Sequence, residues 1–294
     1  MAQTRQRDIE RVRRFRLLDD TFMKVVLRDN IPGVQDIVRV LLRRDDIQVI
    51  SVETQEELTK LYGHSVRLDV LARDAAERLY NIEIQRESSG AGQKRARYHL
   101  GAIDTHAHPP GADYDLLTET YVIFITEADL FGDGLPVYTV DRFIRETGKP
   151  FDDAAHIIYA NGSYRGEDAI GRLMADFRET NPAKMFYRSL AEKAEYYKST
   201  EGGLESMCRI MEEVRDEGRR EGRREGRREG RREGREEGIE IGGRRMRDQM
   251  IDTLLRSNRE ENLLHGEQFR GLGITREEIS EAKARMKNAE QDPD

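Results

Sequence analysis

The chain has 294 residues, of which 36% are charged, with a formal net charge of −7 and one cysteine. Because Cys208 is the single cysteine, an internal disulfide and a thiolate metal cluster are excluded. The negative balance argues against a protein that coats nucleic acid non-specifically, but it is compatible with a local basic groove. The charged N-terminus lacks the apolar segment of a signal peptide, and the densest apolar run, 121–125, is too short to span a bilayer. We therefore expect a soluble, cytoplasmic protein without a membrane partner.

The first third of the chain predicts helices followed by strands. From Asp19 to Leu42 apolar residues recur at helical spacing, and the Pro-Gly pair at 32–33 divides this segment into two helices or one broken helix. Residues 47–53 are β-branched and alternate in polarity, which predicts a strand. Two further strands follow in a hairpin at 66–87.

A second helical segment and a fourth strand come next. Residues 91–107 carry an apolar stripe at i, i+4, i+7 and i+11, formed by Ala96, Leu100, Ile103 and Ala107. This spacing predicts a helix packed on a sheet. Residues 119–127 read as a buried strand. The order α-β-β-β-α-β places the chain in the α/β class.

The second half predicts two more strands, then helices and a charged tail. The runs at 137–143 and 156–162 are strand-like, and residues 167–215 follow a helical pattern. A break with the sequence STEGG at 199–203 ends the main domain. We therefore expect a domain at 1–200 and a charged, helical or flexible tail at 201–294.

The tail contains a tetrapeptide repeat, EGRREGRREGRREGRREGREEG, at 217–238. A period of four drifts around a 3.6-residue helix, and each glycine costs about 1 kcal/mol relative to alanine. The composition predicts a solvated, partly helical spacer, followed by a short apolar helix at 250–256. Two alternatives stay open. The small residues allow two such helices to approach closely as a coiled-coil dimer, or the arginines contact DNA despite the interleaved glutamates.

The hairpin carries an acid within each strand, Asp69 and Glu83. Strand side chains alternate between faces. The face opposite Asp69 is apolar and consists of Val66, Leu68, Val70 and Ala72. A turn that places Asp69 opposite Glu83 brings the two Cβ atoms to about 4.5–5.5 Å. Because a register shifted by one residue would split the apolar faces, core burial and the carboxylate pair require the same register.

Two adjacent carboxylates repel each other unless a cation lies between them. An aspartate and a glutamate with waters suit Mg²⁺, or Mn²⁺ in its place. Such an ion polarises a phosphoryl oxygen and activates a bound water, which Gln85, on the same face as Glu83, would orient. A purely structural explanation also stays open, in which the acids face solvent and Arg67 pairs with Glu83.

The order of elements, with aspartate on the second strand and E-x-Q on the third, resembles the PD-(D/E)XK nuclease core. The resemblance extends to PD-(D/E)XK nuclease family transposases, relatives of the recombination-promoting nucleases. It runs from about Leu17 to Met211 through the blocks LLDDTFMKVVL, VRLDVLAR, NIEIQRE, KRARYHLGAIDTH, ETYVIFITEADLFGDGLPVYTVDR and HIIYANG. It implies a restriction-endonuclease-like αβββαβ core, with a mixed sheet flanked by helices and a helical C-terminal extension.

By this resemblance Asp69 and Glu83 are metal ligands, and Gln85 stands where many of these enzymes have a catalytic lysine. Glutamine holds a water by hydrogen bonds but supplies no positive charge. The cation is expected from the next helix, at Lys94, Arg95 or Arg97; Arg95 best matches the basic block of the family, with Lys94 as an accessory. A solvated helix face is the alternative explanation of these basic residues.

Other residues are expected to assist the site or to bind DNA. Asp20 adds an acidic group from the first helical segment, or serves only as a helix N-cap. Arg86, Lys94 and Arg97 are expected to contact DNA. The histidines of this region are interpreted as ordinary helix-end residues: His99, His106 and His108. Since cutting both strands usually needs two active sites, we expect a homodimer.

Three functional interpretations follow. The leading one is a Mg²⁺-dependent endonuclease that hydrolyses DNA phosphodiester bonds in recombination, transposition-like mobility or defence against foreign DNA. The second, favoured by the missing lysine and the acidic net charge, is a catalytically inactive DNA-binding or assembly protein that retains the nuclease fold. The third is an RNA-processing nuclease, although the sequence contains no recognisable RNA-binding module.

Overall fold

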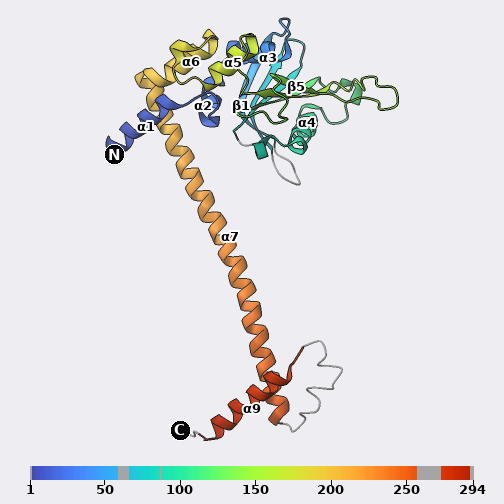
Figure 1. Cartoon of the computed structure of the whole chain (residues 1–294), viewed down its shortest axis with the longest axis vertical. Coiled ribbons are helices and arrows are strands. Elements are labelled where there is room, and N and C mark those ends of the chain that lie inside the picture. The colour runs from blue at the N-terminus through green and yellow to red at the C-terminus, as the bar shows by residue number, and fades with distance from the viewer. Residues whose placement is uncertain (1, 59–65, 87, 257–272, 292–294) are drawn as a thin grey trace. The chain divides into compact units, whose positions relative to one another are not determined.

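A computed structural model describes residues 2–58, 66–86, 88–256 and 273–291 of the chain (Figure 1). The chain divides into two compact units, residues 1–212 and 213–294. The first unit contains the sheet and all residues of the predicted site. In the described residues of the second unit, the regular secondary structure consists of helices.

The first unit is built on one six-stranded sheet. Its strands are β1 (Val49–Leu58), β2 (Val66–Asp74), β3 (Leu79–Gln85), β4 (Thr120–Thr126), β5 (Val137–Val140) and β6 (Ala155–Asn161). They lie in the order β1-β2-β3-β4-β6-β5. The pairs β1–β2, β2–β3 and β5–β6 are antiparallel, whereas β3–β4 and β4–β6 are parallel. The predicted α/β class with a mixed sheet is confirmed.

Helices cover both faces of this sheet (Figure 1). The helical elements are α1 (Ala2–Arg14), α2 (Asp20–Leu27), α3 (Ile31–Leu42), η1 (Ser88–Ala91), α4 (Gln93–Ala107), η2 (Tyr114–Leu116), α5 (Ala169–Arg178), η3 (Pro182–Lys184), α6 (Arg188–Ser199) and α7 (Glu201–Arg256). Residues of α2, α3, α5 and α6 belong to the larger apolar cluster, and residues of α4 to the smaller one. Burial on both faces explains why β4 is apolar almost throughout.

The sequence did not predict α1. Its mean hydropathy is low, and Val12 is its only buried apolar residue among those described. Three arginines in its last turn complement the negative end of the helix dipole. Of the helices in the described segments, none combines the length and apolar composition needed to cross a membrane.

β2 divides its apolar residues between the two clusters. Val70 and Ala72 belong to the larger cluster, whereas Val66 and Leu68 belong to the smaller one. The expectation of one apolar face along the whole strand is therefore wrong at its start. β2 is paired on both sides only at residues 70–73. A two-stranded ribbon twists more strongly than a wider sheet, which turns the first residues toward the other cluster.

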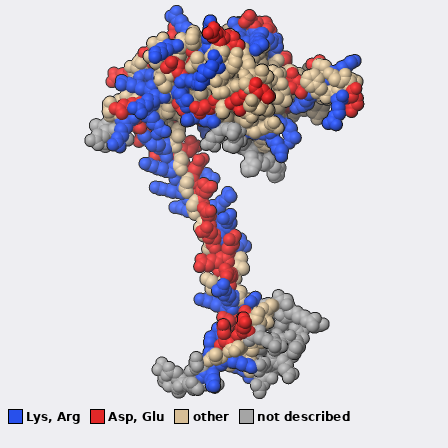
Figure 2. All heavy atoms as spheres, in the orientation of Figure 1, with Lys and Arg blue, Asp and Glu red and all other residues tan. Residues whose placement is uncertain are grey.

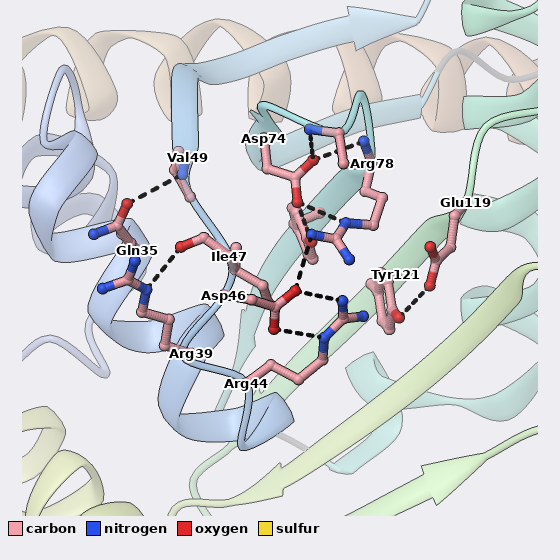
Figure 3. A network of polar contacts seen from close by, with 12 residues as sticks. Gln35, Arg39, Arg44, Asp46, Ile47, Val49, Asp74, Arg78, Glu119 and Tyr121 are labelled. Carbon is pink, nitrogen blue, oxygen red and sulfur yellow. Dashed lines mark hydrogen bonds and ion pairs between the residues drawn. The ribbon is translucent and has the colours of Figure 1, made fainter.

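The turn between β2 and β3 is held by a buried carboxylate, Asp74 (Figure 3). Its Oδ1 accepts the backbone N–H groups of Ala76 and Arg78, each at 2.9 Å. Its Oδ2 accepts from Arg78 Nε at 2.7 Å and from the Tyr80 hydroxyl at 2.8 Å. Arg78 also lies 3.7 Å from Asp46, which ties the turn to the segment that follows α3. These bonds fix the hairpin at its closed end.

The second unit consists of the C-terminal part of α7 packed against α9 (Arg276–Gln291). The repeat at 217–238, predicted to be partly helical, is helical throughout, and the predicted short helix at 250–256 is the last part of α7. No proline interrupts α7, and Glu-to-Arg pairs such as Glu240–Arg244 support it locally. The apolar contact with α9 is formed by Ile251, Leu255, Ile274, Ile279 and Ala282.

Candidate active site

Asp69 and Glu83 face each other across the β2–β3 hairpin. The last registered pair of this ladder is Val70 with Ile82, so Asp69 and Glu83 stand one position further on. At this point the Asp69 backbone N–H donates to Glu83 Oε1 at 3.1 Å. The register predicted from core burial is therefore confirmed. Asp69 is 8% exposed and Glu83 is 0% exposed, so neither is a solvent-facing acid.

The carboxylate of Glu83 has one unused oxygen. Oε1 accepts the Asp69 N–H and lies 3.5 Å from His99 Nδ1. Oε2 has no hydrogen-bond partner among the described residues, and Arg95 Nη2 lies 3.6 Å from it. Burial, and then the charge of Asp69, raises the pKa of Glu83 to about 8, against hydrogen bonds from Asp69 and Asn81 and the charge of Arg95. A buried, unpartnered carboxylate oxygen is costly and would be stabilised by a cation.

Asp69 is paired with a lysine from α2. Lys24 Nζ lies 2.7 Å from Asp69 Oδ1 and 2.8 Å from the Asp20 carboxylate. Burial raises the pKa of Asp69, whereas the charge of Lys24 lowers it. For Lys24, burial lowers the pKa, but the two carboxylates outweigh burial and raise it. Lys24 is therefore a charged ammonium held between Asp20 and Asp69.

His99 connects Glu83 with Arg95. It is 3% exposed, its Nδ1 lies 3.2 Å from Asn81 Nδ2, and its Nε2 lies 3.3 Å from Arg95 Nε. Burial, and then the charge of Arg95, lowers the pKa of His99 to about 4, so the ring is neutral at pH 7. A neutral imidazole has one acceptor nitrogen, so it accepts from only one of these two donors at a time. The orientation of Arg95 is thereby coupled to that of Asn81.

Gln85 turns toward η1. A Cβ at Gly90 would lie 2.0 Å from Gln85 Oε1, so the amide occupies the space that a side chain at position 90 would need. Within the described part of the chain, no hydrogen bond joins Gln85 to either acid. The structure therefore places Gln85 beside η1, and its expected contact with a water stays a prediction.

The basic residues expected to contact DNA have different surroundings. Arg86 lies between Glu127 and Asp19, at 3.0 and 3.1 Å, so its charge is largely balanced within the protein. Lys94 and Arg97 are exposed on the first two turns of α4. Arg95, on the same turns, is 46% exposed and reaches toward Glu83. The start of α4 thus presents basic side chains at the edge of the site.

The donor set fits a hard divalent cation. In the residues that the structure describes, no group of three His, Cys, Asp or Glu side chains forms a ready-made metal site. Mg²⁺, however, commonly binds through one or two carboxylates and keeps several waters. Asp69 and Glu83 supply those carboxylates, and Glu83 Oε2 is unpartnered. These oxygens would hold the ion, and water or substrate oxygens would complete its shell.

Sequence reasoning missed three residues of this site. Lys24 lies four residues after Asp20 on one helix, a spacing that indicates an ion pair. Asn81 precedes Glu83 by two residues, which places both on one face of β3. His99 follows Arg95 by four residues and is buried, so its interpretation as an ordinary helix-end histidine is wrong. The tertiary structure is needed to show that these three residues lie close together.

Comparisons of the chain with protein-family models, with curated proteins and with solved structures found no match.

Proposed function

We propose that this protein is a divalent-metal-dependent endonuclease that hydrolyses phosphodiester bonds in DNA at Asp69 and Glu83. The observation that carries the proposal is a pair of buried carboxylates joined across a hairpin, with Glu83 Oε2 unpartnered. The resemblance to PD-(D/E)XK nuclease family transposases and their restriction-endonuclease-like core supports it. By that resemblance, the biological setting is recombination or the movement of DNA.

The formal charges of the site support a divalent ion together with a phosphodiester. Three carboxylates, Asp20, Asp69 and Glu83, meet two cations, Lys24 and Arg95, which leaves −1 when all are ionised. A divalent cation changes this sum to +1, and one phosphodiester anion returns it to zero. Asp69, Glu83 and Lys24 are largely buried, where an uncompensated charge is costly, whereas Asp20 and Arg95 are about half exposed and partly screened by solvent. This balance favours simultaneous occupation by metal and phosphate.

The residues of the chain divide the remaining tasks. A divalent ion held by Asp69 and Glu83 would polarise a phosphoryl oxygen and lower the pKa of a bound water. Arg95 presents a planar guanidinium suited to phosphate oxygens. Lys94 and Arg97 would hold the DNA backbone further along α4, and a water held by Gln85 would lie beside the acids. A homodimer would supply the second active site needed to cut both strands.

A plasmid cleavage assay tests this function. Supercoiled plasmid is incubated with the wild type, with Asp69→Asn and with Glu53→Gln in Mg²⁺, Mn²⁺ or EDTA. Glu53 is an exposed acid on β1 of the same sheet, so its substitution is a matched control. We expect nicked or linear product from the wild type and Glu53→Gln with either metal, and none with EDTA or from Asp69→Asn. A folded wild type that cleaves with neither metal contradicts the proposal.

A second function is favoured by one observation. Lys24 already occupies one oxygen of Asp69, which would also suit a catalytically inactive DNA-binding or assembly protein. DNA binding that survives EDTA and Asp69→Asn, without cleavage, would support this alternative. Cleavage of an RNA substrate but not of plasmid would support the RNA-processing alternative instead.

A further inference from the structure

Lys24 is fixed in the site by the packing of α2. Its neighbours Phe22, Val25 and Val26 are buried in the larger apolar cluster, with exposures of 1%, 3% and 0%. The lysine side chain is 12% exposed and extends from this anchored helix to Asp69. Its position is therefore determined by the core, although α2 and β2 are distant in the sequence.

The ammonium group has two carboxylate partners of different exposure. The side chain of Asp69 is 11% exposed, whereas that of Asp20 is 51% exposed. A lysine carries three donors on a flexible stem, so it can leave one partner while it keeps the other. Asp20 thus offers a second anchor from which Lys24 can release Asp69.

Lys24 also supplies a charge that β3 lacks. Gln85 is neutral and its amide lies over Gly90. Arg95 reaches the other acid, with its guanidinium 3.6 Å from Glu83. Among the described ion pairs, Lys24 is the cation on the Asp69 side of the site. A charge at this position is close to any phosphate that meets both acids.

We propose that Lys24 is the resident cation of the site. In the metal-free protein it neutralises Asp69, and it competes with the divalent ion for that carboxylate. Once the ion is bound, Lys24 stays paired with Asp20 and balances the negative charge of the phosphodiester. This inference rests on the proposed function and adds a further catalytic residue to it. It also predicts opposite changes in metal affinity and in the rate of hydrolysis, which would fall together if a metal ligand were lost. Loss of the lysine charge strengthens metal binding and weakens hydrolysis.

The experiment measures Mn²⁺ affinity and plasmid cleavage on the same preparations. Mn²⁺ dissociation constants are obtained by calorimetry for the wild type, Lys24→Met, Lys24→Gln and Lys24→Arg. Removal of one positive charge beside a buried carboxylate is expected to tighten Mn²⁺ binding about tenfold or more in the two neutral variants. Cleavage at saturating Mn²⁺ is expected to fall about 100-fold in them. Lys24→Arg keeps the charge and should retain wild-type Mn²⁺ affinity with part of the cleavage rate.

Lys184→Met is the matched control, because Lys184 is an exposed lysine of η3 without a role in the site. It should leave both quantities unchanged. Thermal unfolding identifies folded variants, and Lys24→Gln, which can still donate to Asp69, replaces Lys24→Met if the latter does not fold. Mn²⁺ binding that is unchanged or weaker in the neutral variants overturns the competition. Unchanged cleavage overturns the role toward the phosphodiester.

The wild type distinguishes failure of this inference from failure of the proposed function. A wild type that neither binds Mn²⁺ nor cleaves DNA contradicts the endonuclease itself. If the wild type binds Mn²⁺ and cleaves DNA, and the neutral Lys24 variants have the same Mn²⁺ affinity and cleavage rate, only the role of Lys24 is refuted.

Discussion

The buried, neutral ring of His99 links a polar side chain of β3 with an arginine of α4. His99 lies against Asn81 on one side and Arg95 on the other, and its ring packs 5.9 Å from that of Phe124. His99 Nδ1 also lies 3.5 Å from Glu83 Oε1. Loss of the ring would leave the buried amide nitrogen of Asn81 without this partner, whereas Arg95 is 46% exposed and can be solvated.

We predict that His99→Ala lowers the free energy of unfolding by about 1–3 kcal/mol, because it leaves a buried amide unsatisfied. Urea denaturation measures this loss. His106→Ala, on the exposed side of α4, should change the value by less than about 0.5 kcal/mol. Equal effects of the two substitutions would contradict the role given to His99.

Lys198 is a buried lysine, with 4% of its surface exposed. Its ammonium donates to the carbonyl oxygens of Phe15 and Thr180 and lies 4.9 Å from the centre of the Phe22 ring. Burial lowers the pKa of Lys198 to about 8, from an ordinary value of 10.5. Between these two values the unfolded chain binds more protons than the folded chain, so this residue makes stability rise with pH.

The measurement compares wild type and Lys198→Met by urea denaturation from pH 7 to pH 10.5. The stability of the wild type relative to the variant should increase as pH rises through about 8 and beyond, because the variant lacks the titrating group. A stability difference that is independent of pH would show that Lys198 stays protonated in the folded protein.

At the scale of elements, the β2–β3 hairpin positions the two acids through its turn. Asp74 is 0% exposed and accepts four hydrogen bonds from Ala76, Arg78 and Tyr80. The carboxylate stands five residues from Asp69 on the same strand. A change in the turn would therefore shift the register on which the Asp69–Glu83 contact depends.

Asp74→Ala is predicted to cost about 3–5 kcal/mol of stability, since it leaves the buried Arg78 guanidinium and the Tyr80 hydroxyl unpaired. Chemical denaturation and the circular dichroism of the folded protein would measure this loss. Asp46→Ala removes a carboxylate that is 60% exposed in the same network, so it should cost far less stability than Asp74→Ala. A comparable cost for both would mean that the turn does not depend on Asp74.

The hairpin also shows what the sequence could and could not predict. Apolar alternation predicted both strands and the register, because a slip by one residue would turn the polar side chains of β3 toward the larger apolar cluster. The Lys24–Asp69 pair joins residues far apart in the chain, and no local spacing indicates it. Arg86 looked available for DNA, but it pairs with Asp19 and Glu127, which lie 67 and 41 residues away. Local pattern predicts elements, whereas ion pairs depend on tertiary packing.

At the scale of the whole chain, the repeat in α7 forms a helix from a sequence of poor helix propensity. Figure 2 shows basic and acidic side chains interleaved along it. Its glycines, by contrast, have open space where a Cβ would stand: Gly218, Gly222, Gly226, Gly230, Gly234 and Gly238. Only partial helicity is predicted from the sequence, because each glycine lowers helix propensity.

Because nothing opposes a methyl group there, Gly222→Ala, Gly226→Ala and Gly230→Ala together should stabilise this part of α7 by about 3 kcal/mol. Hydrogen exchange of the amides at 217–238 should slow correspondingly. Exchange in the first unit should stay unchanged, which serves as the internal control. If these glycines instead contact another helix, the added methyl groups would clash with it and exchange would not slow.

The central claim is that Asp69 and Glu83 together hold a divalent cation. The most direct measurement is an anomalous difference map from crystals of the full chain soaked in Mn²⁺. We predict a peak at about 2.0–2.2 Å from a carboxylate oxygen of Asp69 and from Glu83 Oε2, and its absence in Glu83→Gln crystals. A map without a peak at these two carboxylates, from wild-type protein that cleaves DNA in Mn²⁺, would contradict this account and move the active site elsewhere.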